Sequence, residues 1–172
     1  MKIILLTHER ELRKKTNTGA LIPLIMGEDA QLLVWRRKEA DQRLLDMLLS
    51  KKAALLFPEL KPREDAGFVD QRAPILSRLI TNVSINDYEY FVILDATWQQ
   101  ARKMYRQSAY LQNADKVFIH PQKASSFKRR RNQLEEGLCT AECVLELLSL
   151  SRQEERYSAL KTSFDQFNNL TT

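Results

Sequence analysis

The chain has 172 residues and a mass of 20.1 kDa, which is the size of one domain and enough to enclose a hydrophobic core. This length excludes a large multi-domain protein. Hydrophobic residues make up 44% and charged residues 28%, with only four Gly and five Pro, which excludes a disordered tail and a fibrous repeat. The net charge of +5 favours anionic partners, with nucleic acid first among them.

Short apolar runs alternate with longer amphipathic stretches along the chain, a pattern typical of an α/β protein whose mostly parallel sheet is covered by helices. In chain order we predict strands at residues 2–6, 31–36, 53–57, 90–94 and 116–119. We predict helices at residues 40–50, 74–81, 99–108, 140–150 and 154–167, most of them with Leu or Ile at helical spacing. The stretches 57–67, 82–87 and 120–137 break the pattern and are predicted loops.

Several absences limit the possible classes of protein. No linker, repeat or low-complexity tract divides the chain, so residues 1–172 are expected to form a single domain. Cys139 and Cys143 lie too close together in sequence for a disulfide that would stabilise the fold. No further Cys is present to complete a four-ligand zinc site, so no metal is expected. The first apolar run is shorter than a signal-peptide core and no run is long enough to span a membrane. We therefore expect a cytoplasmic protein that does not enter a membrane.

The strongest local feature is the apolar strand 90–94 followed by Asp95, Thr97 and Trp98. The carboxyl end of a strand is where α/β proteins place their sites. Asp95 or Thr97 can instead cap the helix that follows, and Trp98 can be a core aromatic. The spacing alone leaves both the capping and the chemical interpretation open.

Two predicted segments are basic. Helix 99–108 carries three cations around Tyr105, and loop 120–137 carries a denser cluster around Phe127, whose ring we expect to stack on an unpaired base. Such cations neutralise phosphates, and we prefer RNA contact to a merely solvated loop. The RNA-binding candidates are Arg102, Arg106, Ser125, Phe127, Lys128, Arg129, Arg130 and Arg131.

Two further segments carry polar groups. Gly137 begins a turn that runs into helix 140–150, where free backbone N–H groups can receive a small polar ligand, although Gly137 can equally permit the turn while Thr140 caps the helix. His8 and a polar cluster around Asn17 follow the first strand. His8 can be a hydrogen-bonded structural residue without any role in a site.

The motifs together resemble those of the DTW-domain family. Asp95-Ala96-Thr97-Trp98 is similar to its Asp-x-Thr-Trp box. The other matches, in order, are His8-Glu9 with Asn17-Thr18-Gly19, then Leu56-Phe57-Pro58, then Ser125, Phe127, Arg130 and Arg131, and finally Leu138-Cys139-Thr140-Ala141-Glu142. Two departures are notable. The sequence starts at the first strand, without the cysteine-rich segment that members often carry, and Phe127 stands where Tyr is more usual.

The resemblance implies a SPOUT-like scaffold with a C-terminal knot and an S-adenosylmethionine-dependent tRNA-uridine aminocarboxypropyltransferase. In that reaction N3 of a uridine attacks the γ-carbon of the methionine moiety, and methylthioadenosine is released. By the same resemblance Asp95 is the catalytic residue, with orientation of the uracil edge preferred to a role as full base. The cofactor-binding candidates are Phe57, Pro58, Leu94, Thr97, Trp98, Leu138, Cys139 and Thr140.

Other interpretations remain open at this point. The same scaffold can transfer a methyl group to RNA, the acceptor can be ribosomal RNA, or the protein can be an RNA-binding module without catalysis. Arg130 and Arg131 are expected to hold either RNA phosphates or the carboxylate of the cofactor. The sequence identifies neither the modified uridine nor the oligomeric state.

Overall fold

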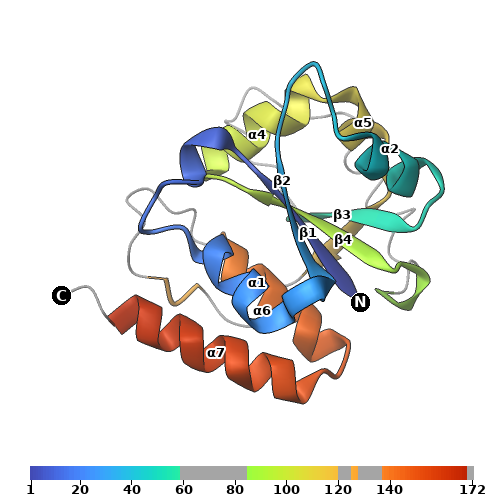
Figure 1. The fold of residues 1–172 in the computed structure, drawn as a ribbon. Coiled ribbons are helices and arrows are strands. Elements are labelled where there is room, and N and C mark those ends of the chain that lie inside the picture. The colour runs from blue at the N-terminus through green and yellow to red at the C-terminus, as the bar shows by residue number, and fades with distance from the viewer. Residues whose placement is uncertain (59–84, 120–124, 128–136, 170–172) are drawn as a thin grey trace, which may run out of the picture.

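A computed structural model describes residues 1–58, 85–119, 125–127 and 137–169. In this part of the chain one sheet contains five parallel strands in the order β2-β1-β4-β3-β5 (Figure 1). The strands are β1 (Lys2–Thr7), β2 (Ala30–Val34), β3 (Ala53–Pro58), β4 (Tyr90–Asp95) and β5 (Lys116–Ile119). The predicted α/β class with a parallel sheet is confirmed.

The central strands are apolar along most of their length because helices cover both faces of the sheet. In β1, Ile3 and Leu5 belong to one core cluster and Ile4 and Leu6 to the other. The strands β1, β3 and β4 therefore contribute side chains alternately to two cores, as the two-residue period of a strand requires.

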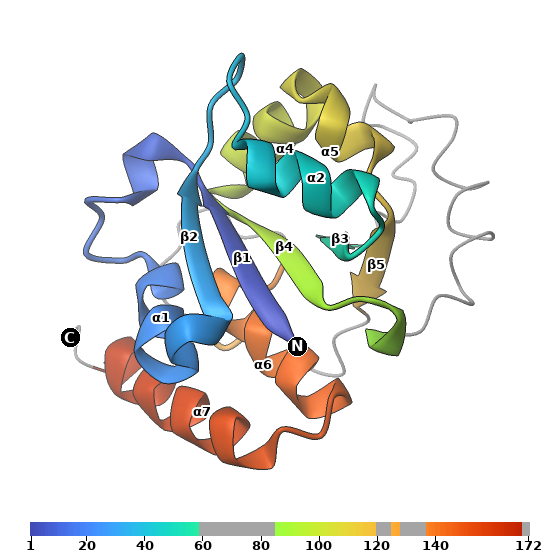
Figure 2. The same ribbon diagram turned by 45° about the vertical axis from the view of Figure 1, so that its right-hand side comes forward.

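Helices form a layer on each side of the sheet, and both ribbon views agree on their distribution (Figures 1 and 2). We call one side the α6 face, which is covered by α1 (Leu21–Met26), α6 (Thr140–Leu150) and α7 (Glu154–Asn169). The opposite side, the α4 face, is covered by α2 (Gln42–Leu49), α4 (Trp98–Gln107) and α5 (Ala109–Asn113).

The ends of β1 and β4 form a topological switch point. The chain leaves β1 for β2 through α1 on the α6 face, but it leaves β4 for β5 through α4 and α5 on the α4 face, in the opposite direction along the sheet. Open α/β sheets bind ligands beyond the carboxyl ends of the strands at such a point. Thr7 and Asp95, which end β1 and β4, are partners in register there.

The predicted elements differ from the observed ones mainly at their ends. Strand 116–119 and helix 140–150 have the predicted bounds, whereas β2 lies at Ala30–Val34 rather than 31–36. Helix α2 begins two residues late because the Asp41 carboxylate caps it, accepting a hydrogen bond of 2.9 Å from the Arg43 amide. Helix α4 begins one residue earlier than predicted, and α7 extends to Asn169.

Several short elements were not predicted. Helices α1 and α5 have only six and five residues, which is too short for a helical period to stand out. Part of the predicted loop 82–87 is a 3-10 turn, Ile85–Asp87. The predicted helix 74–81 lies outside the described residues. Among those that are described, no helix combines the length and apolar character needed to cross a membrane.

Candidate functional site

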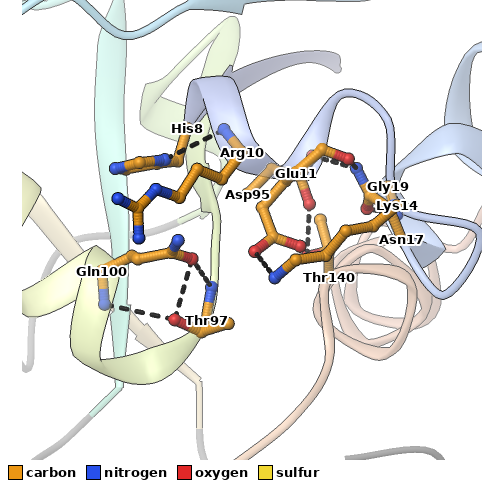
Figure 3. Close-up of polar contacts among 10 residues, drawn as sticks. All are labelled: His8, Arg10, Glu11, Lys14, Asn17, Gly19, Asp95, Thr97, Gln100 and Thr140. Carbon is orange, nitrogen blue, oxygen red and sulfur yellow. Dashed lines mark hydrogen bonds and ion pairs between the residues drawn. The ribbon is translucent and has the colours of Figure 1, made fainter.

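Asp95 lies at the centre of the switch point, where its side chain points to the α6 face. Only 1% of the residue is exposed. Its Oδ2 atom accepts hydrogen bonds from Thr7 Oγ1 at 3.1 Å and from Asn17 Nδ2 at 2.9 Å. Its Oδ1 atom accepts one from Thr140 Oγ1 at 2.9 Å (Figure 3). The carboxylate thus joins the end of β1, the loop that follows it and the start of α6.

The turn at Gly19 covers the carboxylate of Asp95. The Asn17 side chain holds this turn by accepting a hydrogen bond of 2.7 Å from the Gly19 amide. A Cβ atom at position 19 would lie only 2.6 to 2.7 Å from the carboxylate atoms of Asp95. Position 19 therefore requires glycine because of this close approach.

Thr18 completes the connection between the N-terminal loop and α6. Thr18 is buried, and its hydroxyl accepts a hydrogen bond of 3.3 Å from the backbone amide of Ala141 in the first turn of α6. Three of the segments singled out in the sequence, 17–19, 95–98 and 138–142, consequently meet at one point. Direct contact of Asp95 with Asn17, Thr7 and Thr140 was not predicted from the sequence.

Burial has the largest effect on the pKa of Asp95. Desolvation raises its pKa, and the three hydrogen bonds from Asn17, Thr140 and Thr7 act in the opposite direction. The nearby Glu11 carboxylate, which is buried and paired with Lys14, adds to the upward shift. Because both oxygens already accept hydrogen bonds from the protein, the geometry favours Asp95 as a group that holds segments in place rather than as a free base.

Thr97, not Asp95, caps helix α4. Its hydroxyl accepts a hydrogen bond of 3.3 Å from the Gln100 amide, and the Gln100 side-chain oxygen accepts one of 2.9 Å from the Thr97 amide (Figure 3). This reciprocal pair is a capping box. Trp98 follows at the first helical position, is half-buried and belongs to neither described core cluster, so the core interpretation of its ring is not supported.

The other cofactor candidates lie at the same edge of the sheet but differ in what they present. Cys139 is fully buried, and desolvation raises the pKa of its thiol well above the usual range. Leu94 packs toward the α4 face, on the side of the sheet opposite to Asp95. Phe57 and Pro58 end β3, and their side chains lie outside the described part of the structure.

The main chain that leads into α6 offers polar groups to a ligand at this edge. Leu138 is half-buried, and its backbone N–H and carbonyl form no hydrogen bond with any described residue. A backbone donor and acceptor side by side suit the edge of an adenine ring. The residues present are thus compatible with a nucleoside-containing cofactor, held here by main-chain groups.

Glu142 fixes the short segment 125–127 to the start of α6, which the sequence analysis did not foresee. Its side chain accepts hydrogen bonds from Ser125 Oγ at 2.6 Å, from the Ser126 amide at 2.7 Å and from the Cys139 amide at 2.8 Å. The residue is 7% exposed. The sequence signals were the place of Glu142 in a family motif and its position three residues after the capping residue Cys139, which is typical of a capping box.

The expectation that Phe127 offers an exposed stacking face is wrong. Phe127 is 5% exposed and packs against Phe164 of α7, with ring centroids 6.2 Å apart. Asn168 of α7 also donates a hydrogen bond of 2.9 Å to the Ser126 carbonyl. The charged neighbours of Phe127 in sequence suggested solvent, but burying an aromatic ring is more favourable than leaving it in water.

The remaining RNA candidates are only partly described. Arg102 is half-buried and Arg106 is exposed, both on α4. Lys128, Arg129, Arg130 and Arg131 lie outside the described residues.

His8 forms an aromatic pair that was not predicted. Its ring stacks on Trp35, with centroids 5.7 Å apart and planes inclined by 22°. Its Nδ1 atom accepts a hydrogen bond of 3.2 Å from the Arg10 amide, which caps the 3-10 turn Glu9–Glu11. Desolvation of the imidazole lowers the pKa of His8, and the positive charge of Arg10 lowers it further. The predicted hydrogen bonding of His8 is confirmed.

A family model described as DTW domain matches residues 1–172, the whole chain. No solved structure matches the chain significantly.

Proposed function

The chain belongs to the DTW-domain family, and we propose that it transfers a 3-amino-3-carboxypropyl group from S-adenosylmethionine to N3 of a uridine in tRNA. One observation carries the proposal: the motif segments 17–19, 95–98 and 138–142 converge at the switch point of the sheet, where α/β proteins bind ligands. A cytoplasmic location and a SPOUT-like knotted scaffold belong to the same proposal. Residues 59–84, 120–124 and 128–136 lie outside the described part of the structure, so the knot stays a prediction.

The chemistry defines what the protein has to supply. A bound donor provides a sulfonium that activates the γ-carbon, so the N3–Cγ bond forms, the Cγ–S bond breaks, methylthioadenosine leaves and the N3 proton is lost. Because the sulfonium is already a good leaving group, the protein mainly orients the base and assists loss of the proton.

We assign Asp95 a positioning role in this reaction. Through Thr140 it fixes the start of α6, and through Asn17 it fixes the turn that covers the site. The Leu138 main chain and the half-buried Trp98 would contact the donor, whereas Cys139 and Leu94 would contribute through the backbone because their side chains enter the core. Thr97 would hold the first turn of α4 beside the donor.

The test is incubation of the protein with bulk tRNA and S-adenosylmethionine labelled either in the methyl group or in the carboxyl group. Transfer of carboxyl-derived label to tRNA, with no methyl-derived label, is the expected result. Mass spectrometry of the nucleosides should then show 3-(3-amino-3-carboxypropyl)uridine. Methyl label on RNA would replace the proposal with a methyltransferase, and label on ribosomal RNA alone would change the acceptor.

A pair of variants separates catalysis from folding. Asp95→Asn should abolish or strongly reduce transfer in a protein that still unfolds cooperatively. The matched control is Asp115→Asn, which removes an acid at the opposite edge of the sheet whose carboxylate accepts a hydrogen bond of 3.1 Å from Tyr88. If neither wild type nor control transfers any part of the donor, the proposed reaction is contradicted, and tRNA binding without transfer would indicate an RNA-binding module.

A further inference from the structure

The positive charge of the described residues is concentrated beyond the carboxyl ends of β1, β2 and β4. The segments 8–15, 35–41 and 98–107, which follow these three strands, contain ten Lys and Arg residues against four Asp and Glu residues. That excess is larger than the net charge of +5 of the entire chain. Since the three strands are neighbours and parallel, the three segments lie at the same edge of the sheet.

A rigid pair of rings lies in the middle of this edge. Trp35 directly follows β2, its amide donates a hydrogen bond of 2.9 Å to the Thr7 carbonyl, and its indole Nε1 donates one of 2.9 Å to Ser108 at the end of α4. The His8 amide donates one of 3.0 Å to the Asp95 carbonyl. The stacked His8–Trp35 pair is half-buried, and these hydrogen bonds attach both residues to β1, β4 and α4.

Cations lie near the ring pair together with the carboxylates of Glu9 and Glu11, and three of these cations have no carboxylate partner among the described residues. Arg36 and Arg37 follow Trp35 in sequence, and Lys103 lies on α4 close enough to act electrostatically on His8. All three are exposed, and within the described ranges none of them forms an ion pair. Figure 3 shows the Arg10 side chain directed from its turn toward the first turn of α4, on the same side as His8.

Unpaired cations next to a fixed aromatic surface suit a single-stranded nucleic acid, because the cations neutralise phosphates and the rings stack on a base. We propose that this edge is the RNA-docking surface of the protein, where Arg36, Arg37 and Lys103 contact phosphates and the His8–Trp35 pair stacks on an unpaired base. The proposal rests on the proposed RNA substrate and states where that RNA is held. The surface leads directly into the site, because the Asp95 carbonyl accepts the hydrogen bond of the His8 amide.

The first experiment measures binding of an unmodified tRNA transcript by fluorescence anisotropy, without donor, over a range of salt concentrations. The triple variant Arg36→Gln, Arg37→Gln, Lys103→Gln should bind about tenfold more weakly or worse, and its salt slope should fall by roughly two to three. The charge-matched control is Lys51→Gln, Lys52→Gln, Arg152→Gln, three exposed cations at the opposite edge of the sheet. The control variant should keep the tRNA affinity and the salt slope of wild type.

The second experiment tests stacking. His8→Ala should weaken binding of a uridine-containing single strand roughly five- to a hundredfold at every salt concentration, without changing the salt slope. His8→Phe should restore affinity, although it shares with His8→Ala the loss of the cap on Glu9–Glu11. Rescue by Phe therefore separates stacking from a structural role, and a strand with abasic sites should not distinguish the two variants.

The proposal would be overturned if the two triple variants weakened tRNA binding equally. It would also be overturned if the Arg36–Arg37–Lys103 variant kept the salt slope of wild type. Binding of polyglutamate of equal charge as tightly as RNA would replace the RNA with an acidic protein. The outcomes are separable from those of the proposed function. Loss of affinity without any transfer activity would support this docking surface alone, whereas transfer with normal affinity in the triple variant would support only the proposed reaction.

Discussion

The Cβ position of Gly19 lies 2.6 Å from Oδ1 of Asp95, so the two residues keep their places only because position 19 has no side chain. Asp95 is covered by a backbone turn rather than by side chains. This arrangement shields the carboxylate from water and makes the turn sensitive to any added atom.

We expect Gly19→Ala to destabilise the protein by about 1–3 kcal/mol, because the new methyl group must displace the carboxylate of Asp95. Urea unfolding measures the change. In an Asp95→Ala background, where the three nearest atoms are gone, the same substitution should cost much less, with a coupling energy of about 1 kcal/mol or more. An equal cost in both backgrounds would show that the contact is not responsible.

Asp95 should make stability depend on pH. Because its pKa is raised in the folded state, the folded protein binds this proton more tightly than the unfolded chain does. The resulting stabilisation is complete below the unfolded pKa of about 3.9 and is lost as the pH rises through the folded-state pKa. The free energy of unfolding of wild type relative to Asp95→Asn should therefore fall from about pH 4 upward.

Asp29→Asn is a control of opposite sign for this prediction. The Arg156 guanidinium beside Asp29 lowers the pKa of that carboxyl, so the stability it contributes is lost as the pH falls through its folded-state pKa. Urea unfolding of wild type and both variants across the acidic range measures the two trends. If the Asp95 difference stays constant with pH, burial does not raise its pKa.

Thr97→Ala should destabilise α4 by about 1 kcal/mol, because the cap on the Gln100 amide is lost. Thr97→Ser keeps the hydroxyl and should retain most of the stability. Thermal unfolding of the two variants measures the difference. A parallel loss of donor binding in Thr97→Ala but not in Thr97→Ser would link the cap to the donor site.

Glu142→Gln should cost about 1–3 kcal/mol, since one carboxylate oxygen serves the Ser126 amide and the other serves the Cys139 amide. A glutamine offers only one oxygen, so one buried amide loses its acceptor in either orientation. Glu146→Gln is the matched control one turn later on α6. Burial and the Glu142 charge raise the pKa of Glu146, so its replacement should leave stability unchanged or slightly higher at neutral pH. Equal losses in both variants would contradict the assigned role of Glu142.

Most of the sheet and of the longer helices were predictable from the sequence, because the strands are short, mainly apolar runs and α2 and α6 repeat apolar residues at helical spacing. Phe127 was misplaced because its charged neighbours give no sign that the ring reaches Phe164, 37 positions later in the sequence. Burial of one ring in a polar segment depends on tertiary structure, to which local composition is insensitive.

The site was predictable in part. The position of Asp95 after a buried strand indicated the correct edge of the sheet, and the motifs indicated which segments belong together. The contact with Asn17 and the close approach of Gly19 depend on how β1 and β4 lie in register, which neither spacing nor propensity specifies. The His8–Trp35 pair was missed for the same reason, because it joins the ends of two different strands.

The three hydrogen bonds to the Asp95 side chain connect residues that are 88, 78 and 45 positions apart in sequence. Contacts of such long range form late, because closing long loops costs entropy before any contact compensates for it. A chain still emerging from the ribosome has all of β1 and β4 before it has Thr140. Binding of a small molecule at this site would therefore report the completed tertiary structure and stabilise only that state.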